Sequence, residues 1–167
     1  MNRIIVIGCP GSGKSTFSRK LHELIGFPLY HLDMMYWNSD RTTVEKTVFR
    51  NQLSDVIQKE KWIIDGNYGS TIELRLQACD TAFFLDYSTE ICLEGIRERR
   101  GMARSDMPWV ERADEEDAEF IEFIKNYNVQ SRPEIINLLN NYPDKSIYIF
   151  KNRNDADAFI EKLKINE

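Results

Sequence analysis

A short stretch near the start of the chain combines the residue types that hold phosphate groups. It matches the P-loop pattern GxxxxGK[ST]. Glycines lack a Cβ, so the backbone can bend tightly and bring its N–H groups against phosphate oxygens. The lysine is expected to bridge the outer phosphates, and the following serine hydroxyl to bind Mg²⁺. The predicted contacts to nucleotide phosphates come from Gly8, Pro10, Gly11, Ser12, Gly13, Lys14, Ser15 and Thr16.

Three aspartates each follow a predicted strand, namely Asp33, Asp65 and Asp86. Open α/β sheets place their ligands at the carboxyl ends of the strands, so these side chains are candidates for the same site. Asp65 follows Trp-Ile-Ile, and we predict that it holds Mg²⁺ directly or through water, together with Ser15. Asp86 is interpreted as a turn or helix-cap residue.

An arginine-rich run could supply the positive charge that phosphoryl transfer needs. The candidates are Arg97, Arg100 and Arg104. Arg97 and Arg100 have the spacing of two residues on one helical face, with Arg99 expected to point elsewhere. The alternative is a solvated helix end, where arginines complement the helix dipole.

Apolar patterning predicts the elements that position these groups. Strands are expected at 4–7, 28–32, 62–64, 81–85 and 146–150, with helices between them. This alternation predicts an α/β fold, a parallel sheet with helices on both faces, in one domain over residues 1–167. The segment of about residues 101–112 has the weakest pattern, and we expect it to form a mobile lid.

Polar residues also predict where helices begin. Thr42-x-x-Glu45 and Ser131-x-x-Glu134 have the form of capping boxes, the second with Pro133 in the first helical turn. The helix predicted after Thr42 is expected to bury an apolar stripe that includes Val48. Asn154 is expected to cap the last helix.

Composition narrows the setting and the partners. The 167 residues are 42% hydrophobic, and no apolar run reaches the roughly 20 residues that span a bilayer. A net charge of −5 does not favour stable binding to DNA or to an anionic membrane. The three cysteines form no CxxC pair, which favours a reduced, cytoplasmic setting. Cys9 is interpreted as a small residue that fills the P-loop, although the helix terminus could lower its pKa.

Several pieces of the sequence together resemble one group of proteins. These are GCPGSGKST, His31-Leu-Asp33 with Tyr36-Trp37, the stretch 62–68 (WIIDGNY), Phe84-Leu-Asp86, and the arginine run from Arg97. They resemble the nucleoside-monophosphate-kinase-like branch of P-loop proteins, and within it the small adenylate-kinase-like group labelled DNA topology modulation or FlaR-related proteins.

The resemblance implies a sheet of strand order 2-3-1-4-5, ATP as phosphoryl donor, and an arginine-bearing lid over the phosphates. It implies that Asp33 orients or deprotonates the acceptor hydroxyl, and that Arg132, at the start of a later helix, returns toward the site. The chain departs from adenylate kinase after Asp65-Gly66, where Asn67-Tyr68-Gly69 replaces the arginine that grips the phosphate of AMP.

The leading hypothesis is an ATP- and Mg²⁺-dependent kinase acting on a nucleotide, a nucleoside or another small metabolite. The alternative is a regulatory ATP-binding protein or ATPase switch that acts on DNA topology or on a protein partner. A GTPase is a third option, and it rests on an imperfect match of Asn152-Arg-Asn-Asp155 to the guanine-reading motif. Met34 to Trp37 are expected either to line an acceptor pocket or to fill the core.

Overall fold

The aliphatic residues Ile4–Ile7 form the central strand of a five-stranded parallel sheet in the computed structural model, which describes residues 1–165. This strand, β1 (Arg3–Gly8), pairs with β3 (Trp62–Asp65) on one side and with β4 (Thr81–Leu85) on the other. β2 (Leu29–His31) and β5 (Ser146–Phe150) lie at the two edges. The order is β2-β3-β1-β4-β5, which confirms the predicted fold class and strand order.

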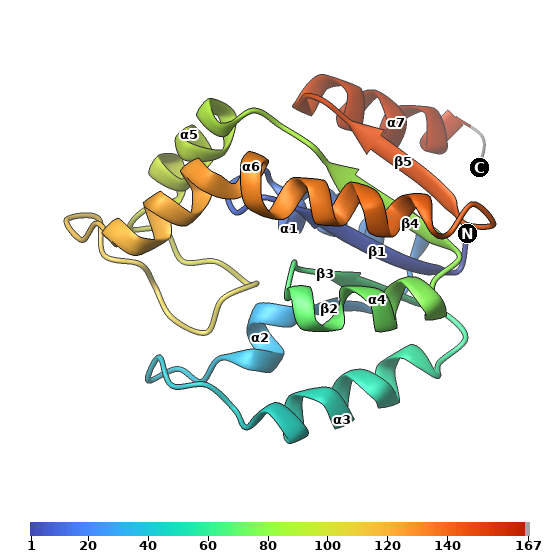
Figure 1. Cartoon of the computed structure of the whole chain (residues 1–167), viewed down its shortest axis with the longest axis horizontal. Helices are drawn as coiled ribbons and strands as arrows, with labels where there is room; N and C mark the ends of the chain where they lie inside the picture. The colour runs from blue at the N-terminus through green and yellow to red at the C-terminus, as the bar shows by residue number, and fades with distance from the viewer. Residues whose placement is uncertain (166–167) are drawn as a thin grey trace.

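Helices cover both faces of this sheet (Figure 1). On one face lie α1 (Lys14–Ile25) and α7 (Arg153–Ile165), which pack against each other. The other face is covered by α4 (Gly69–Ala78) and the long α6 (Ala118–Asn140), with α3 (Lys46–Ile57) packed outside α4. α5 (Thr89–Arg99) packs against α6, and the short α2 (Leu32–Tyr36) directly follows β2.

The two central neighbours of β1 are as buried as β1 itself. All residues of β3 and β4 are buried, as expected for strands with helices on both sides. The edge strand β5 is largely exposed along its length. The register sets Val6 of β1 beside both Asp65 of β3 and Phe83 of β4, so these strands end side by side at one edge of the sheet.

The first predicted capping box is wrong. The helix α3 begins at Lys46, and its N-cap residue Glu45 makes no side-chain capping bond. The Thr42 hydroxyl and backbone N–H instead donate to the Asp40 carboxylate, within a turn closed by an isolated bridge between Trp37 and Thr43. Val48 is 42% exposed and therefore lies outside the buried stripe of this helix.

The second capping box is also wrong, because α6 runs without interruption through Ser131 and Pro133. Buried residues before and after this point, Ile124 and Ile135 among them, hold the helix on one continuous apolar face. A proline inside a helix removes the bond to the carbonyl four residues earlier, here that of Val129. Val129 is 78% exposed, so its turn of the helix lies at the protein surface.

The last helix has a different cap from the one predicted. Asn152, not Asn154, accepts a hydrogen bond from the backbone N–H of Asp155, while Asn154 lies inside the first turn of α7. Ser88 caps α5, since its hydroxyl accepts a hydrogen bond from the backbone N–H of Ile91.

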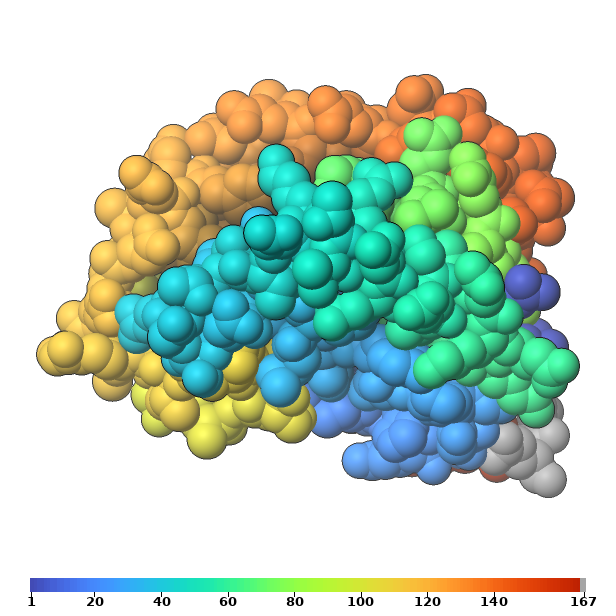
Figure 2. Space-filling view, turned by 90° about the horizontal axis from the view of Figure 1, so that it is seen from below, coloured from blue at the N-terminus to red at the C-terminus, as the bar shows by residue number. Residues whose placement is uncertain are grey.

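A long irregular connection, residues 100–117, joins α5 to α6 and contains the 101–112 segment. Viewed from below, this connection lies beside the residues that follow α2 (Figure 2). Trp109 there contacts Trp37, and Arg41 pairs with Glu115 at 3.5 Å. Within residues 1–165, no helix has both the length and the apolar character that crossing a membrane requires.

Candidate functional site: a phosphate-binding cleft

The P-loop backbone has a conformation that glycine adopts more easily than other residues. Gly11 and Gly13 have φ angles of 83° and 92°, in the left-handed region that favours glycine. A Cβ on Gly11 would lie 2.0 Å from the carbonyl oxygen of Cys92, so the loop packs directly on the backbone of α5. Lys14 folds back over the loop, and its Nζ donates to the carbonyls of Gly8 and Cys9 at 2.9 and 3.1 Å.

A second loop supports the P-loop from the end of β3. The Asn67 side-chain oxygen accepts a hydrogen bond of 2.9 Å from the backbone N–H of Gly8. The fully buried Arg75 donates in turn to the carbonyls of Gly66, Asn67 and Tyr68. Burial lowers the pKa of Arg75 to about 9. Sequence reasoning missed both supporting residues, because only the fold brings them under the glycine-rich loop.

Cys9 is a packing residue of this loop. It is buried, and a hydrogen bond with Cys92 together with burial raises the pKa of its thiol. The interpretation of Cys9 as a small residue that fills the loop is therefore consistent with the structure.

Two of the three strand-end aspartates face the P-loop. Asp65 is buried, and one of its oxygens lies 2.8 Å from Nδ1 of His31. Asp33, in α2, accepts a 2.5 Å hydrogen bond from the Tyr68 hydroxyl. Burial raises the pKa of Asp33, while the Tyr68 bond and the charge of Lys14 act against this rise. The two carboxylates therefore lie together at the edge where the sheet strands end.

Asp86 is not the turn or cap residue that its position suggested. Its carboxylate is buried and receives two hydrogen bonds from Arg132, at 2.7 and 2.8 Å, and a third from Lys151. Arg132 lies in the middle of α6 rather than at a helix start. It is absent from the cleft lining, since Asp86 holds its guanidinium.

The 101–112 segment places its own carboxylate on the P-loop. Asp106 is buried and accepts a 2.8 Å hydrogen bond from the hydroxyl of Ser15. Its other oxygen lies 3.7 Å from Arg19 and 3.8 Å from Arg104. Asp106 lies in a stretch without periodic apolar residues, so no pattern in the sequence indicates that it reaches the P-loop.

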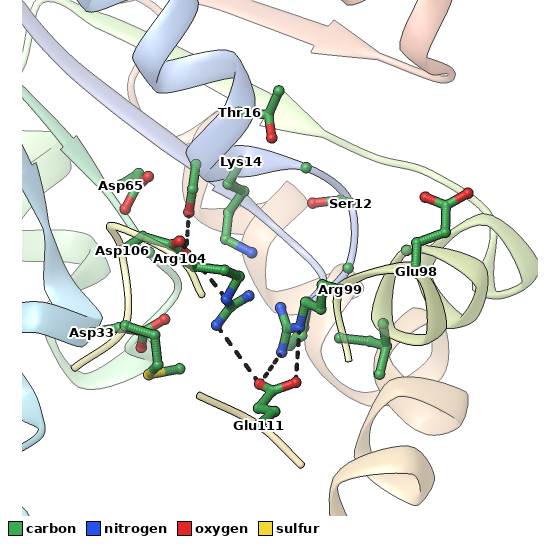
Figure 3. A pocket seen from close by; sticks show the side chains of 18 of the residues that line it. Ser12, Lys14, Thr16, Asp33, Asp65, Glu98, Arg99, Arg104, Asp106 and Glu111 are labelled. Atoms are coloured by element: carbon green, nitrogen blue, oxygen red, sulfur yellow. Dashed lines mark hydrogen bonds and ion pairs between the residues drawn. The ribbon is translucent and has the colours of Figure 1, made fainter. Parts of the chain in front are cut away.

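The arginines that enter the site differ from those predicted by helical spacing. α5 ends at Arg99, and Arg100 has φ −59° and ψ 136°, outside the helix, so the shared-face argument for Arg97 and Arg100 is wrong. Arg97 is exposed and does not line the cleft, whereas Arg99, Arg100 and Arg104 do. Arg99 and Arg104 both approach Glu111 (Figure 3).

These groups surround one cleft of about 900 Å³. Its floor is the P-loop, and Arg99, Arg104 and Glu111 form one side. Another part of its lining is aromatic, with Trp37, Tyr68 and Trp109. The rings of Trp37 and Trp109 meet edge to face at 5.3 Å, so the 101–112 segment and the end of α2 form one wall.

Solved structures of two other proteins have a similar fold. The chain is similar to the shikimate kinase from Bacteroides thetaiotaomicron, with 19% identity, a TM-score of 0.60 and coverage of 99% of this chain and 97% of that one. It has the fold of the shikimate kinases. The shikimate kinase from Acinetobacter baumannii in complex with shikimate is also similar, with 15% identity, a TM-score of 0.58 and coverage of 98% and 90%. No family model and no curated protein matches the chain.

Two buried donors of the cleft lack hydrogen-bond partners in the described part of the chain. Ser12 Oγ in the P-loop and Nη2 of Arg104 are buried and have no hydrogen-bond partner among residues 1–165. Buried donors without partners are costly, so both fit a ligand rich in acceptor oxygens. Ser15 and Asp65 offer the oxygen ligands that Mg²⁺ prefers. Among the described residues, no three His, Cys, Asp or Glu side chains form a metal site by themselves. Mg²⁺ at this position would therefore need further ligands, such as phosphate oxygens.

Proposed function

We propose that this protein is an ATP- and Mg²⁺-dependent phosphotransferase whose acceptor is a small hydroxyl-bearing metabolite. The observation that carries the proposal is the arrangement of charge in the cleft. Cations from the P-loop, α5 and the 101–112 segment lie on one side, and the half-buried carboxylate of Asp33 lies near them. Phosphoryl transfer requires mainly positioning and charge neutralisation, which this arrangement supplies.

On the donor side, backbone N–H groups of the P-loop and the N-terminus of α1 would bind the phosphates of ATP. Lys14 would exchange its bonds to the Gly8 and Cys9 carbonyls for bonds to phosphate oxygens. Ser15 and Asp65 would hold Mg²⁺, which neutralises charge on the phosphates. Arg99 and Arg104 would stabilise the transferring group.

On the acceptor side, Asp33 would accept the proton of the attacking hydroxyl. The hydroxyl oxygen would form a bond to the γ-phosphorus as the bond to the leaving oxygen of ADP breaks, and the proton would remain on the carboxylate. Burial raises the pKa of Asp33. That direction favours a general base, whose efficiency increases as its pKa approaches the working pH.

The test is transfer of labelled γ-phosphate from ATP to a panel of nucleoside monophosphates, nucleosides and small alcohols, with shikimate included because of the structural neighbours. A Lys14→Ala variant is the control. A labelled product that requires both an acceptor and Lys14 supports the proposal. ATP binding without transfer to any acceptor would instead favour the regulatory ATPase switch.

A further inference from the structure

One carboxylate in the cleft is shared by two arginines. Glu111 Oε1 lies 3.0 Å from Nη2 of Arg99 and 3.6 Å from Nη2 of Arg104, and its Oε2 lies 3.4 Å from Nε of Arg99. In Figure 3 the Glu111 carboxylate points at the two guanidinium groups from the side away from the P-loop. Both arginines therefore hold an anion that belongs to the protein itself.

The same two arginines share the cleft with the P-loop lysine. Lys14, Arg99 and Arg104 all line it, and Figure 3 shows their cationic groups pointing into the same part of the cleft. Burial lowers the pKa of Lys14, and the charge of Arg99 adds to that effect. Burial also lowers the pKa of Arg99, with Arg104 acting in the same direction. Arg99 is thus repelled by Arg104 and itself repels Lys14, and such repulsion between like charges disfavours the charged forms of these groups.

Glu111 satisfies this cation cluster only in part. The Nη2 group of Arg104 is buried, yet it makes no hydrogen bond within residues 1–165, and its nearest Glu111 oxygen is at 3.6 Å. The Glu111 side chain remains 26% exposed, so its carboxylate has access to water. A phosphoryl group carries three acceptor oxygens and more negative charge than a carboxylate, so it would satisfy donors that Glu111 leaves unpaired.

We propose that Glu111 is a resident counter-ion of Arg99 and Arg104, and that the terminal phosphoryl group of the nucleotide displaces it on binding. Glu111 thereby sets the affinity of the site for a triphosphate, because each binding event must first break its bonds to the two arginines. The inference rests on the proposed function, since it takes the same cleft as the ATP site.

The experiment compares the wild-type protein with Glu111→Gln and Glu116→Gln by calorimetric titration with ATP and with ADP in the presence of Mg²⁺. Glu116 is the matched control. It lies in the same connection and approaches Arg100 at 3.8 Å, but its side chain is 64% exposed. Both variants remove one negative charge, so a general charge effect would appear equally in both. Thermal unfolding of each variant checks that it is folded.

We expect Glu111→Gln to bind ATP roughly five- to tenfold more tightly than the wild type, because a partly exposed ion pair of about 1 kcal/mol no longer has to be broken. The gain should be smaller for ADP, which lacks the terminal phosphoryl group, and Glu116→Gln should change neither affinity by more than about twofold. Unchanged or weaker ATP binding by Glu111→Gln would overturn the proposal, because Glu111 would then support the arginines rather than compete for them. An equal gain for ATP and ADP would overturn it as well.

Failure of the proposed function gives a different result. If the wild type binds no nucleotide but Glu111→Gln binds ATP, the counter-ion role is supported, and the transfer assay decides the activity. If neither protein binds ATP or inorganic tripolyphosphate, both proposals are wrong. If all proteins bind ATP as expected but no acceptor is phosphorylated, only the kinase proposal is wrong.

Discussion

Asp86 and Glu111 are each a single carboxylate shared by two cations, but they occupy very different parts of the molecule. Asp86 lies at the end of β4, and its cations come from α6 and from the residue after β5. Its side chain is 3% exposed and its bonds to Arg132 are 2.7 and 2.8 Å long. Glu111 lies in the irregular 101–112 segment, is 26% exposed, and reaches its arginines at 3.0 to 3.6 Å.

The difference shows how one chemical arrangement can serve two purposes. Regular elements on three sides hold Asp86 and its cations, so this network joins α6 to the ends of β4 and β5. Glu111 holds Arg99 and Arg104 where the cleft is open to a ligand, and a stronger anion can replace it. The first network should therefore determine stability, and the second should determine ligand affinity.

The largest expected effect concerns the arginines of the Glu111 network. Arg99→Ala should lower the rate of phosphoryl transfer by roughly 100-fold or more, because it removes a charge that stabilises the transferring group. Arg97→Ala is the matched control, since Arg97 lies on the same helix but is exposed and outside the cleft. Steady-state assays with the acceptor found in the panel would measure both rates. Equal losses in the two variants would contradict the assignment of Arg99 over Arg97.

The next effect concerns stability. Asp86→Asn should lower the free energy of unfolding by about 1–3 kcal/mol, because it leaves Arg132 and Lys151 without their shared anion. The expected loss of stability is modest because the Lys151 side chain is 61% exposed and water screens its charge. Urea unfolding followed by circular dichroism would measure it. No loss of stability would mean that the Asp86 network does not hold α6 and β5 in place.

The pH dependence of that loss provides a sharper test. Burial by itself raises the pKa of Asp86, but the hydrogen bonds from Arg132 and Lys151 outweigh it and hold the pKa below its ordinary value. A carboxyl group with a depressed pKa in the folded state stabilises the protein above its unfolded pKa of about 3.9, and this contribution is lost as the pH falls further. The difference between wild type and Asp86→Asn should be constant above about pH 5 and shrink below about pH 4. A difference that grows on acidification would show the opposite sign of linkage.

The smallest effect is expected for the stability of the Glu111→Gln variant. Its free energy of unfolding should differ from that of the wild type by less than about 1 kcal/mol, since the pair is partly exposed and glutamine keeps its size. The same urea unfolding experiment applies. A loss as large as that of Asp86→Asn would remove the contrast between the two networks.

The sequence was sufficient to predict those parts of the fold and the site that depend on local residue spacing. The P-loop, the strand before it and the aspartates at the strand ends could all be read from short patterns, and the sheet order followed from the resemblance. Arg99 was missed because the spacing argument assumed a helix that continues through Arg100, whereas α5 ends at Arg99. A shift of one residue at a helix end changes which side chain faces the cleft.

Other parts of the site depend on contacts between distant residues. Ser15 and Asp106 are 91 positions apart, and Asp86 and Arg132 are 46 apart. Asp106 and Glu111 lie in a segment without periodic apolar residues, so no pattern indicates which way their side chains point. Their roles follow only once the fold brings the 101–112 segment over the P-loop.

The loop that supports the P-loop has a consequence for protein engineering. Tyr68 has a φ of 34°, a costly conformation for a residue other than glycine, and Arg75 holds the carbonyls of this loop from α4. Asn67 in the same loop binds the backbone N–H of Gly8. The shape of the P-loop thus depends on residues outside Gly8–Thr16. A designer who grafts Gly8–Thr16 onto another strand and helix would need to carry over the Asn67 loop and its buried arginine, or provide equivalents, to keep its shape.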